Sequence, residues 1–372
     1  MRKGLYIHLP FCRSKCWYCD FYSKPYGRAE AESYIKALMR EREMRFYGSP
    51  WSENGEEPVW DTAYIGGGTP SVIPTDLLDR VIGIPHVAPG GEYTIEANPE
   101  QVDSEWLGKI RDAGINRVSM GVQSFVPDLL DSVGRHFQPG RAQKAIEALA
   151  ESGLNFSLDL IYGLPGQTIG QWSDSLRRML SFRPNHFSAY LLSYEPGTRL
   201  YARLVAGKVA EASDTVVEDM YALLCREARE AGYEHYEVSS FALPGYRARH
   251  NSSYWDGTPY LGIGCSAHSF DGVDRASNPS SVSVYMRELG KGALPLEIET
   301  ETPLDRLNDT IITSLRTSRG FLVPDNAPEP MIRAVSRHLS AGTLVAAAEG
   351  RVAIPESAWL RSDAVMRDLI QV

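Results

Sequence analysis

Three cysteines near the start of the chain are the residues best suited to chemistry. Cys12, Cys16 and Cys19 form a C-x3-C-x2-C spacing directly after a strand-like run. Three thiolates on one loop can bind one inorganic centre, and soft thiolate sulfur selects iron–sulfur clusters, zinc or copper(I). A zinc site is expected to have four ligands in paired C-x2-C spacings, which this loop does not show. The one observation that favours zinc is the nearby nitrogen ligand His8. The trio therefore predicts a four-iron cluster with one open iron.

The amino-acid composition of the chain is typical of a globular protein. Of 372 residues, 43% are apolar and 23% are charged, and 38 basic against 47 acidic residues give a net charge of −9. This balance argues against a nucleic-acid surface, which needs clustered positive charge, and leaves small molecules and proteins as partners. No apolar run reaches the roughly 18–20 residues of a membrane helix, so we expect a cytoplasmic protein, with peripheral membrane association left open. Five cysteines predict reduced thiols without a disulfide framework.

Alternating strand and helix patterns must position the cysteine loop. Helical patterns of period 3 to 4 separate most of the strand-like runs, and three helices end in a glycine that suits the left-handed turn back to a sheet. Such alternation implies parallel pairing, because each return to a parallel strand needs a crossover. The fold class is therefore α/β, a partial (β/α)6 barrel or an open wound sheet. The six strand-like runs are residues 5–9, 63–65, 92–96, 117–122, 155–161 and 186–192.

Polar residues appear late in three of these otherwise apolar strands. Glu96, Gln123 and Asp159 each follow or interrupt a run that should be buried. Ligands gather at the carboxyl ends of parallel strands, so this pattern predicts a site there. Helix capping, or pairing within the fold, is the structural alternative for each residue taken alone.

The pattern loosens after Gly197, and three domains are predicted: residues 1–200, 201–300 and 301–372. A helix at 215–231 and a strand at 235–239 precede residues 271–302, which are rich in Ser, Pro and Gly and indicate a connecting region. The last part predicts helices at 304–317 and 331–341, a hairpin at 344–354 and a final helix. Helices followed by a two-stranded ribbon indicate a winged-helix-like module. Because the chain is acidic, we expect this module to pack against the barrel or a partner protein rather than to bind DNA.

The cysteine loop and a glycine run resemble the radical S-adenosylmethionine (SAM) superfamily. Tyr18 stands before the third cysteine, and the string Ile-Gly-Gly-Gly-Thr-Pro at 65–70 resembles the family motif for the SAM amino group. In that family, the open iron takes the amino and carboxylate groups of SAM, and an electron from the cluster cleaves the sulfonium to a 5′-deoxyadenosyl radical. The resemblance therefore implies a [4Fe-4S] cluster and SAM as cofactors, with the protein supplying binding and positioning.

Matching to the porphyrin-related branch of this family implies a set of SAM contacts. A carboxylate such as Asp159 suits ribose hydroxyls, a guanidinium such as Arg135 suits a carboxylate, and the Gln123 amide can donate and accept. The implied contacts are Tyr6, Tyr18, Gly67, Gly68, Thr69, Glu96, Gln123, Arg135 and Asp159.

Two relatives share this branch: the oxygen-independent coproporphyrinogen III dehydrogenase and the HemW-type haem chaperones. The dehydrogenase pattern carries a further cysteine two residues after the third cluster cysteine, where this chain has Phe21. The first strand also begins close to Met1, without the dehydrogenase's long leader. Both departures favour the chaperones.

A second motif, His-Asn-Ser-Ser-Tyr-Trp at 250–255, resembles the H-N-x-x-Y-W signature of these chaperones. The resemblance implies that His250 binds haem iron, since a neutral imidazole is its commonest proximal ligand, while the aromatic residues offer flat faces to the macrocycle. Arg247 and Arg249 suit the propionates, and His268 is a candidate second ligand.

The resemblance implies a protein that holds haem, the cluster and SAM and passes haem to respiratory haem proteins. Two alternatives stay open from the sequence. One is an enzyme of porphyrin biosynthesis that decarboxylates coproporphyrinogen III oxidatively. The other is a radical methyltransferase or a haem-degrading enzyme, because such enzymes use the same barrel.

Overall fold

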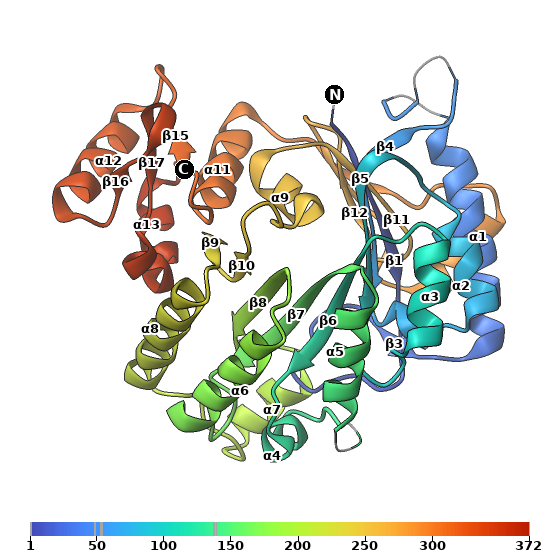
Figure 1. Ribbon diagram of the computed structural model, residues 1–372. Helices are drawn as coiled ribbons and strands as arrows, with labels where there is room; N and C mark the ends of the chain where they lie inside the picture. The colour runs from blue at the N-terminus through green and yellow to red at the C-terminus, as the bar shows by residue number, and fades with distance from the viewer. Residues whose placement is uncertain (1, 48–49, 53–54, 137, 139, 372) are drawn as a thin grey trace.

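Six parallel strands form the centre of the sheet, in the order in which they occur along the chain. The computed structural model describes residues 2–371 except 48–49, 53–54, 137 and 139 (Figure 1). Neighbouring strands of this set pair in parallel, which confirms the six predicted runs and the predicted α/β class. These strands are β1 (Gly4–Leu9), β4 (Val59–Gly67), β5 (His86–Ala97), β6 (Arg117–Gln123), β7 (Asn155–Tyr162) and β8 (His186–Leu191).

Helices connect these strands and cover the outer face of the sheet (Figure 1). The three predicted helix-ending glycines, Gly114, Gly153 and Gly232, have φ values of 103°, 74° and 88°, the left-handed conformation that returns the chain toward the sheet. The covering helices are α1 (Arg28–Phe46), η1 (Pro70–Val72), α2 (Thr75–Ile82), α3 (Ser104–Asp112), α4 (Pro127–Ser132), α5 (Arg141–Glu151) and α6 (Ile169–Ser181).

Residues after β8 extend both edges of this sheet. At one edge, β10 (Ser240–Ala242) and β9 (Glu234–Glu237) add antiparallel to β8. At the other, β11 (Tyr260–Ile263) pairs in parallel with β1, and β12 (His268–Phe270), β13 (Arg275–Ser277) and β14 (Glu297–Glu299) follow antiparallel. The helices of this part are α7 (Arg199–Val205), α8 (Asp214–Glu230), α9 (Arg249–Asp256) and α10 (Val282–Gly290).

The prediction that residues 271–302 are a connecting region was wrong, because they contain β13, α10 and β14. Their polar sequence reflects an edge position, and every residue of β14 is exposed. A short parallel pair, β2 (Phe11–Cys12) and β3 (Lys24–Pro25), frames the cysteine loop.

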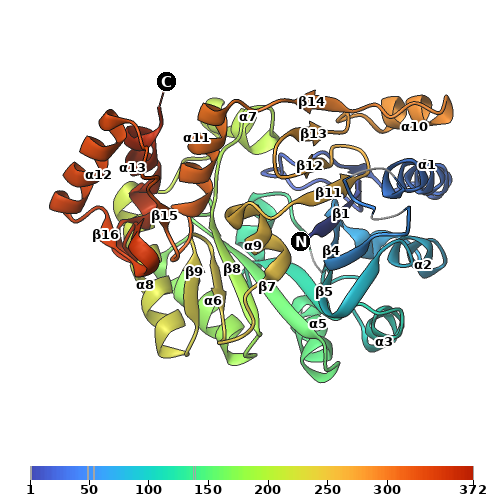
Figure 2. The ribbon, with the colours of Figure 1, turned by 90° about the horizontal axis from the view of Figure 1, so that it is seen from above.

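The C-terminal residues form the predicted winged-helix-like arrangement. It contains α11 (Pro303–Ser314), β15 (Phe321–Leu322), α12 (Glu329–Ala341), β16 (Val345–Ala346), η2 (Ala348–Gly350), β17 (Arg351–Ala353), η3 (Glu356–Arg361) and α13 (Ser362–Leu369). The three strands pair antiparallel, and β15 is an addition that the sequence pattern did not predict. Figure 2 shows this module beside α8 and β9. The domain boundaries at residues 200 and 300 stay a prediction, since residues 201–300 contribute strands to the main sheet.

The core lies between the sheet and its helices. Trp172 of α6 is fully buried, and its indole N–H donates to the carbonyl of Met220 in α8 at 3.0 Å, so this large side chain is buried without an unsatisfied donor. In the described part of the chain, none of the helices combines the length and the apolar character needed to cross a membrane.

Candidate functional site

A cavity of about 1570 Å³ is lined by residues of all six parallel strands, including their carboxyl ends. It is larger than the roughly 300–1,000 Å³ of a typical small-molecule pocket, so it has room for more than one ligand. All three cluster cysteines line it, and so does every residue that the sequence assigned to SAM. These are Cys12, Cys16, Cys19, Tyr6, Tyr18, Gly67, Gly68, Thr69, Glu96, Gln123, Arg135 and Asp159.

Hydrogen-bond donors point at two of the cysteine sulfurs. The Thr69 hydroxyl donates to Cys12 Sγ at 3.6 Å, and Arg135 Nη1 donates to Cys16 Sγ at 3.4 Å. Burial raises the pKa of the Cys19 thiol to about 11, so a bare thiolate is disfavoured there and a bound metal must supply the compensating charge. Three thiols on one cavity wall with donors to their sulfurs fit an iron–sulfur cluster, whose sulfurs accept such bonds.

The glycine run at the end of β4 packs against the start of the cysteine loop. A Cβ at Gly67, which has φ 108°, would lie 2.7 Å from the ring of His8, and one at Gly68 would lie 2.5 Å from the carbonyl oxygen of Phe11. The backbone N–H groups of Gly68 and Thr69 donate to the carbonyls of Leu9 and Phe11, just before the cysteine loop, at 2.8 and 2.7 Å. These glycines therefore permit close approach of the backbone to the loop that carries the cysteines.

Two half-buried carboxyl groups, those of Glu96 and Asp159, line the cavity. Burial raises the pKa of Glu96 to about 7 and that of Asp159 to about 6. The Tyr64 hydroxyl donates to Glu96 Oε1 at 2.8 Å, and Ser119 Oγ donates to Asp159 Oδ2 at 3.5 Å. Carboxylates in a water-poor wall accept hydrogen bonds from ligand hydroxyl or ammonium groups strongly.

Replacing Glu96 with glutamine should stabilise the ligand-free protein at pH 8, by up to about 3 kcal/mol. The pKa of Glu96 in the folded protein lies near 7, above its usual 4.5. Ionisation of Glu96 therefore opposes folding fully above about pH 7, and this cost disappears as the pH falls toward 4.5. The difference between Glu96→Gln and wild type should therefore shrink as pH falls from 8 to 5. Urea unfolding at both pH values measures it, with exposed Glu105→Gln as the control. An equal gain at both pH values would contradict the assignment.

Strand β6 presents its polar side to the cavity. Positions 117, 119, 121 and 123 line the cavity, whereas Val118, Met120 and Val122 between them are fully buried. Gln123 ends the strand with φ 69°, where the pairing register with β7 shifts. Such a conformation is unfavourable for a residue with a side chain and is common at functional sites.

Arg117 is a cavity residue that the sequence reasoning missed. It is only 4% exposed and lines the cavity, and within the described residues its guanidinium has no hydrogen bond or ion pair. Its charge partly offsets the rise that burial causes in the pKa of Asp159 in the same cavity, and a buried guanidinium without a hydrogen-bonded anion gains stability when an anion binds it directly. The sequence feature that could have revealed it is the alternation of polar and apolar residues in β6, which places Arg117 on the same face of the strand as Ser119 and Gln123.

His250 lies behind the cavity wall rather than in it. Its ring is fully buried, Nδ1 lies 2.9 Å from Thr62 Oγ1, and Nε2 lies 2.9 Å from the Tyr254 hydroxyl. The ring also stacks on Tyr64 at 5.2 Å, and burial lowers the pKa of His250 to about 3. Tyr254 and Trp255 do line the cavity. The structure thus brings the aromatic residues of the motif to the cavity, and His250 holds one of them, Tyr254.

Of the other predicted haem contacts, His268 lines the cavity, whereas Arg247 and Arg249 do not. His268 is exposed, lines the cavity and, among the described residues, has no hydrogen-bond partner for its ring. Arg247 pairs with Glu234, and Arg249 donates to the carbonyl of Gly90. The two arginines line a separate small hollow, so neither faces the cavity.

Comparisons with known proteins agree with this geometry. Residues 6–179 match the model of the radical SAM superfamily. The chain is 36% identical over 327 residues to the heme chaperone HemW of Mycobacterium tuberculosis, covering 86% of this chain and 82% of that protein. It is 37% identical over 271 residues to the heme chaperone HemW of Escherichia coli, covering 71% and 69%.

Among solved structures, the coproporphyrinogen III oxidase (HemN) of Escherichia coli, a radical SAM enzyme, superposes with a TM-score of 0.84 at 21% identity. The match covers 100% of this chain and 90% of that one. This likeness shows the fold, including the part beyond the family model.

Proposed function

The chain belongs to the HemW family of radical SAM proteins, and from this premise we propose that it is a haem chaperone holding a [4Fe-4S] cluster, SAM and haem. Delivery of haem to respiratory haem proteins, from a cytoplasmic location, is the finer part of this proposal. The observation that carries it is that one cavity is lined both by the cysteine trio and by the aromatic residues of the 250–255 motif.

The cysteine side of the cavity has the residues that a cluster and SAM require. When bound, the cluster supplies an open iron and an electron for SAM. Cys12, Cys16 and Cys19 would hold it, and Arg135 would keep its hydrogen bond to the Cys16 sulfur. Asp159 would accept hydrogen bonds from ligand hydroxyl groups.

The same cavity supplies aromatic faces and a cation. Tyr254, Trp255 and Tyr260 line it, and so does Arg117, whose guanidinium has no hydrogen bond to an anion in the described residues. Haem is a flat macrocycle with two carboxylates, so we propose that Arg117 binds a propionate in a charge-assisted hydrogen bond. This contact takes the place of the propionate contacts that the sequence assigned to Arg247 and Arg249.

Arg117→Met should weaken haem binding about 10- to 100-fold, the loss expected when a charged hydrogen bond of about 1.5–3 kcal/mol disappears. Titration of cluster-loaded protein with haem, followed by absorbance, measures the affinity. Arg247→Met is the matched control and should bind haem like wild type, because Arg247 pairs with Glu234 outside the cavity. Equal losses in both variants would count against the propionate contact.

Anaerobic reconstitution followed by measurement of iron, sulfide, SAM and haem tests the proposal as a whole. Transfer of bound haem to an apo haem protein is the expected result. The competing function is oxidative decarboxylation of coproporphyrinogen III, which the shared fold accommodates. At the position of the dehydrogenase's extra cysteine, the cavity has Phe21, which is 66% exposed. Porphyrin formed from coproporphyrinogen III with SAM and a reductant would overturn the chaperone assignment, and so would a methylated or ring-opened haem product.

A further inference from the structure

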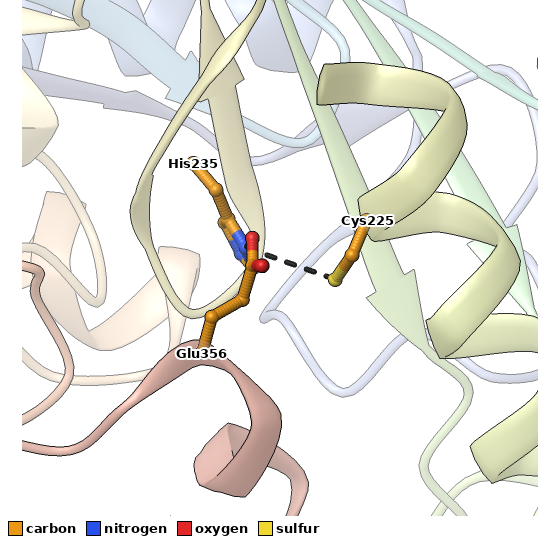
Figure 3. A group of neighbouring side chains, drawn as sticks. All are labelled: Cys225, His235 and Glu356. Atoms are coloured by element: carbon orange, nitrogen blue, oxygen red, sulfur yellow. Dashed lines mark hydrogen bonds and ion pairs between the residues drawn. The ribbon is translucent and has the colours of Figure 1, made fainter. Parts of the chain in front are cut away.

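Three potential metal ligands from separate elements meet outside the cavity, between the sheet and the C-terminal module. Cys225 comes from α8, His235 from β9 and Glu356 from η3 (Figure 3). The thiol sulfur, an imidazole nitrogen and a carboxylate oxygen all lie within 4.8 Å of one another. Cys225 is 8% exposed, the His235 side chain is 7% exposed and that of Glu356 is 31% exposed, so solvent reaches the group only from the glutamate side.

The hydrogen bonds of His235 cannot all be satisfied by a neutral ring. Nδ1 lies 2.8 Å from Glu356 Oε1, and Nε2 lies 3.5 Å from the carbonyl oxygen of Val238. A neutral imidazole has one N–H, yet both nitrogens face oxygen acceptors. A cation between Nδ1 and the carboxylate would resolve the conflict, with Nε2–H donating to Val238.

We propose that Cys225, His235 and Glu356 bind one zinc ion that ties the C-terminal module to the sheet. Zinc takes thiolate, imidazole and carboxylate ligands at about 2.0–2.3 Å in tetrahedral geometry, which places neighbouring S and N ligands about 3.6 Å apart and N and O ligands about 3.3 Å apart. The observed Cys225 Sγ to His235 Nδ1 distance is 3.9 Å, and the His235 Nδ1 to Glu356 Oε1 distance is 2.8 Å. The first distance must shorten by about 0.3 Å and the second lengthen by about 0.5 Å, and all three ligand atoms already lie within 4.8 Å of one another.

The surroundings of this trio match those of known zinc ligands. The His235 ring is fixed between Phe241, stacked at 3.9 Å, and Trp359, edge-on at 4.3 Å. Arg229 pairs with Glu356 Oε2, so the second carboxylate oxygen is held while Oε1 stays directed at the imidazole. Zinc-bound histidines donate their other N–H to a carbonyl, and zinc-bound carboxylates are themselves hydrogen-bonded. With three protein ligands, water fills the fourth position from the exposed side of Glu356.

Zinc added anaerobically to the cluster-loaded protein tests this proposal. After desalting, we expect one zinc per chain with the iron content unchanged, and zinc-edge X-ray absorption with one sulfur and three nitrogen or oxygen ligands. Zinc on the cluster cysteines would instead give a sulfur-rich shell and would overturn the site, as would a protein that retains no zinc. Because this readout is the zinc shell, its outcome is independent of haem binding and of the proposed function.

Two variants and two matched controls locate the ion. Cys225→Ser and Glu356→Gln should each lower zinc affinity by more than about 100-fold, beyond the 10- to 100-fold typical of outer-shell changes. Glu356→Gln keeps the side chain's size and its carbonyl acceptor, so it remains informative if Cys225→Ser folds poorly. Cys265→Ser and Glu349→Gln change the same residue types elsewhere and should bind zinc like wild type. Wild-type affinity in Glu356→Gln would overturn the proposal.

Discussion

Replacing Cys12, Cys16 and Cys19 together with serine should remove all cluster iron and the sulfur-to-iron charge-transfer absorption. Each cysteine lines the cavity, and the structure offers donors to the Cys12 and Cys16 sulfurs, so these thiolates are the proposed ligands. Serine is a hard oxygen donor that holds iron–sulfur clusters poorly. We expect a drop from about four irons per chain to none, measured after anaerobic reconstitution together with acid-labile sulfide.

The control for this experiment is the remaining pair of cysteines. Cys225 and Cys265 are buried away from the cavity, so Cys225→Ser and Cys265→Ser should keep their full iron and sulfide content. Iron that survives in the triple variant, or zinc in place of iron in the wild type, would remove the basis for a radical SAM site. Circular dichroism checks that the triple variant keeps the α/β fold, because the loop is also held by its own backbone bonds, such as Tyr26 N–H to the Cys12 carbonyl at 2.8 Å.

The sequence predicted the six parallel strands because each is a buried apolar run ended by turn residues, a local pattern. It could not predict β11 joining β1, since that pairing brings together residues more than 250 positions apart. It also misjudged residues 271–302, where the edge strand β14 is exposed to solvent and therefore has a polar sequence like that of a loop.

The candidate site shows the same division between local pattern and tertiary contact. The three clustered cysteines and the strand-end polar residues have a local signature, and all of them line the cavity. The placement of Arg117 inside the cavity and of His250 behind its wall depends on how β6 and α9 pack, which motif matching does not report. The cluster of Cys225, His235 and Glu356 spans 132 positions of the chain and has no local signature at all.

His268→Ala should remove the histidine signature of bound ferric haem, whereas His250→Gln should keep it. For His250 to bind iron, its hydrogen bonds to Thr62 and Tyr254 and its stacking on Tyr64 must break. At about 1 kcal/mol for each, this costs about 3 kcal/mol, or roughly 150-fold in affinity. His268 needs no such rearrangement, because its exposed ring already lines the cavity.

The conservative and the truncating variant of His250 separate ligation from positioning. The amide of His250→Gln can both donate and accept, so it can still hydrogen-bond to Tyr254 and should preserve the aromatic wall. His250→Ala should weaken haem binding through a loosened α9. If His250 is the axial ligand, as the motif implies, both variants lose the low-spin electron paramagnetic resonance signal and His268→Ala keeps it. If only His268→Ala loses this signal, His268 of β12 is the iron ligand. His250 then serves to orient Tyr254, because neither of its ring nitrogens is needed at the metal.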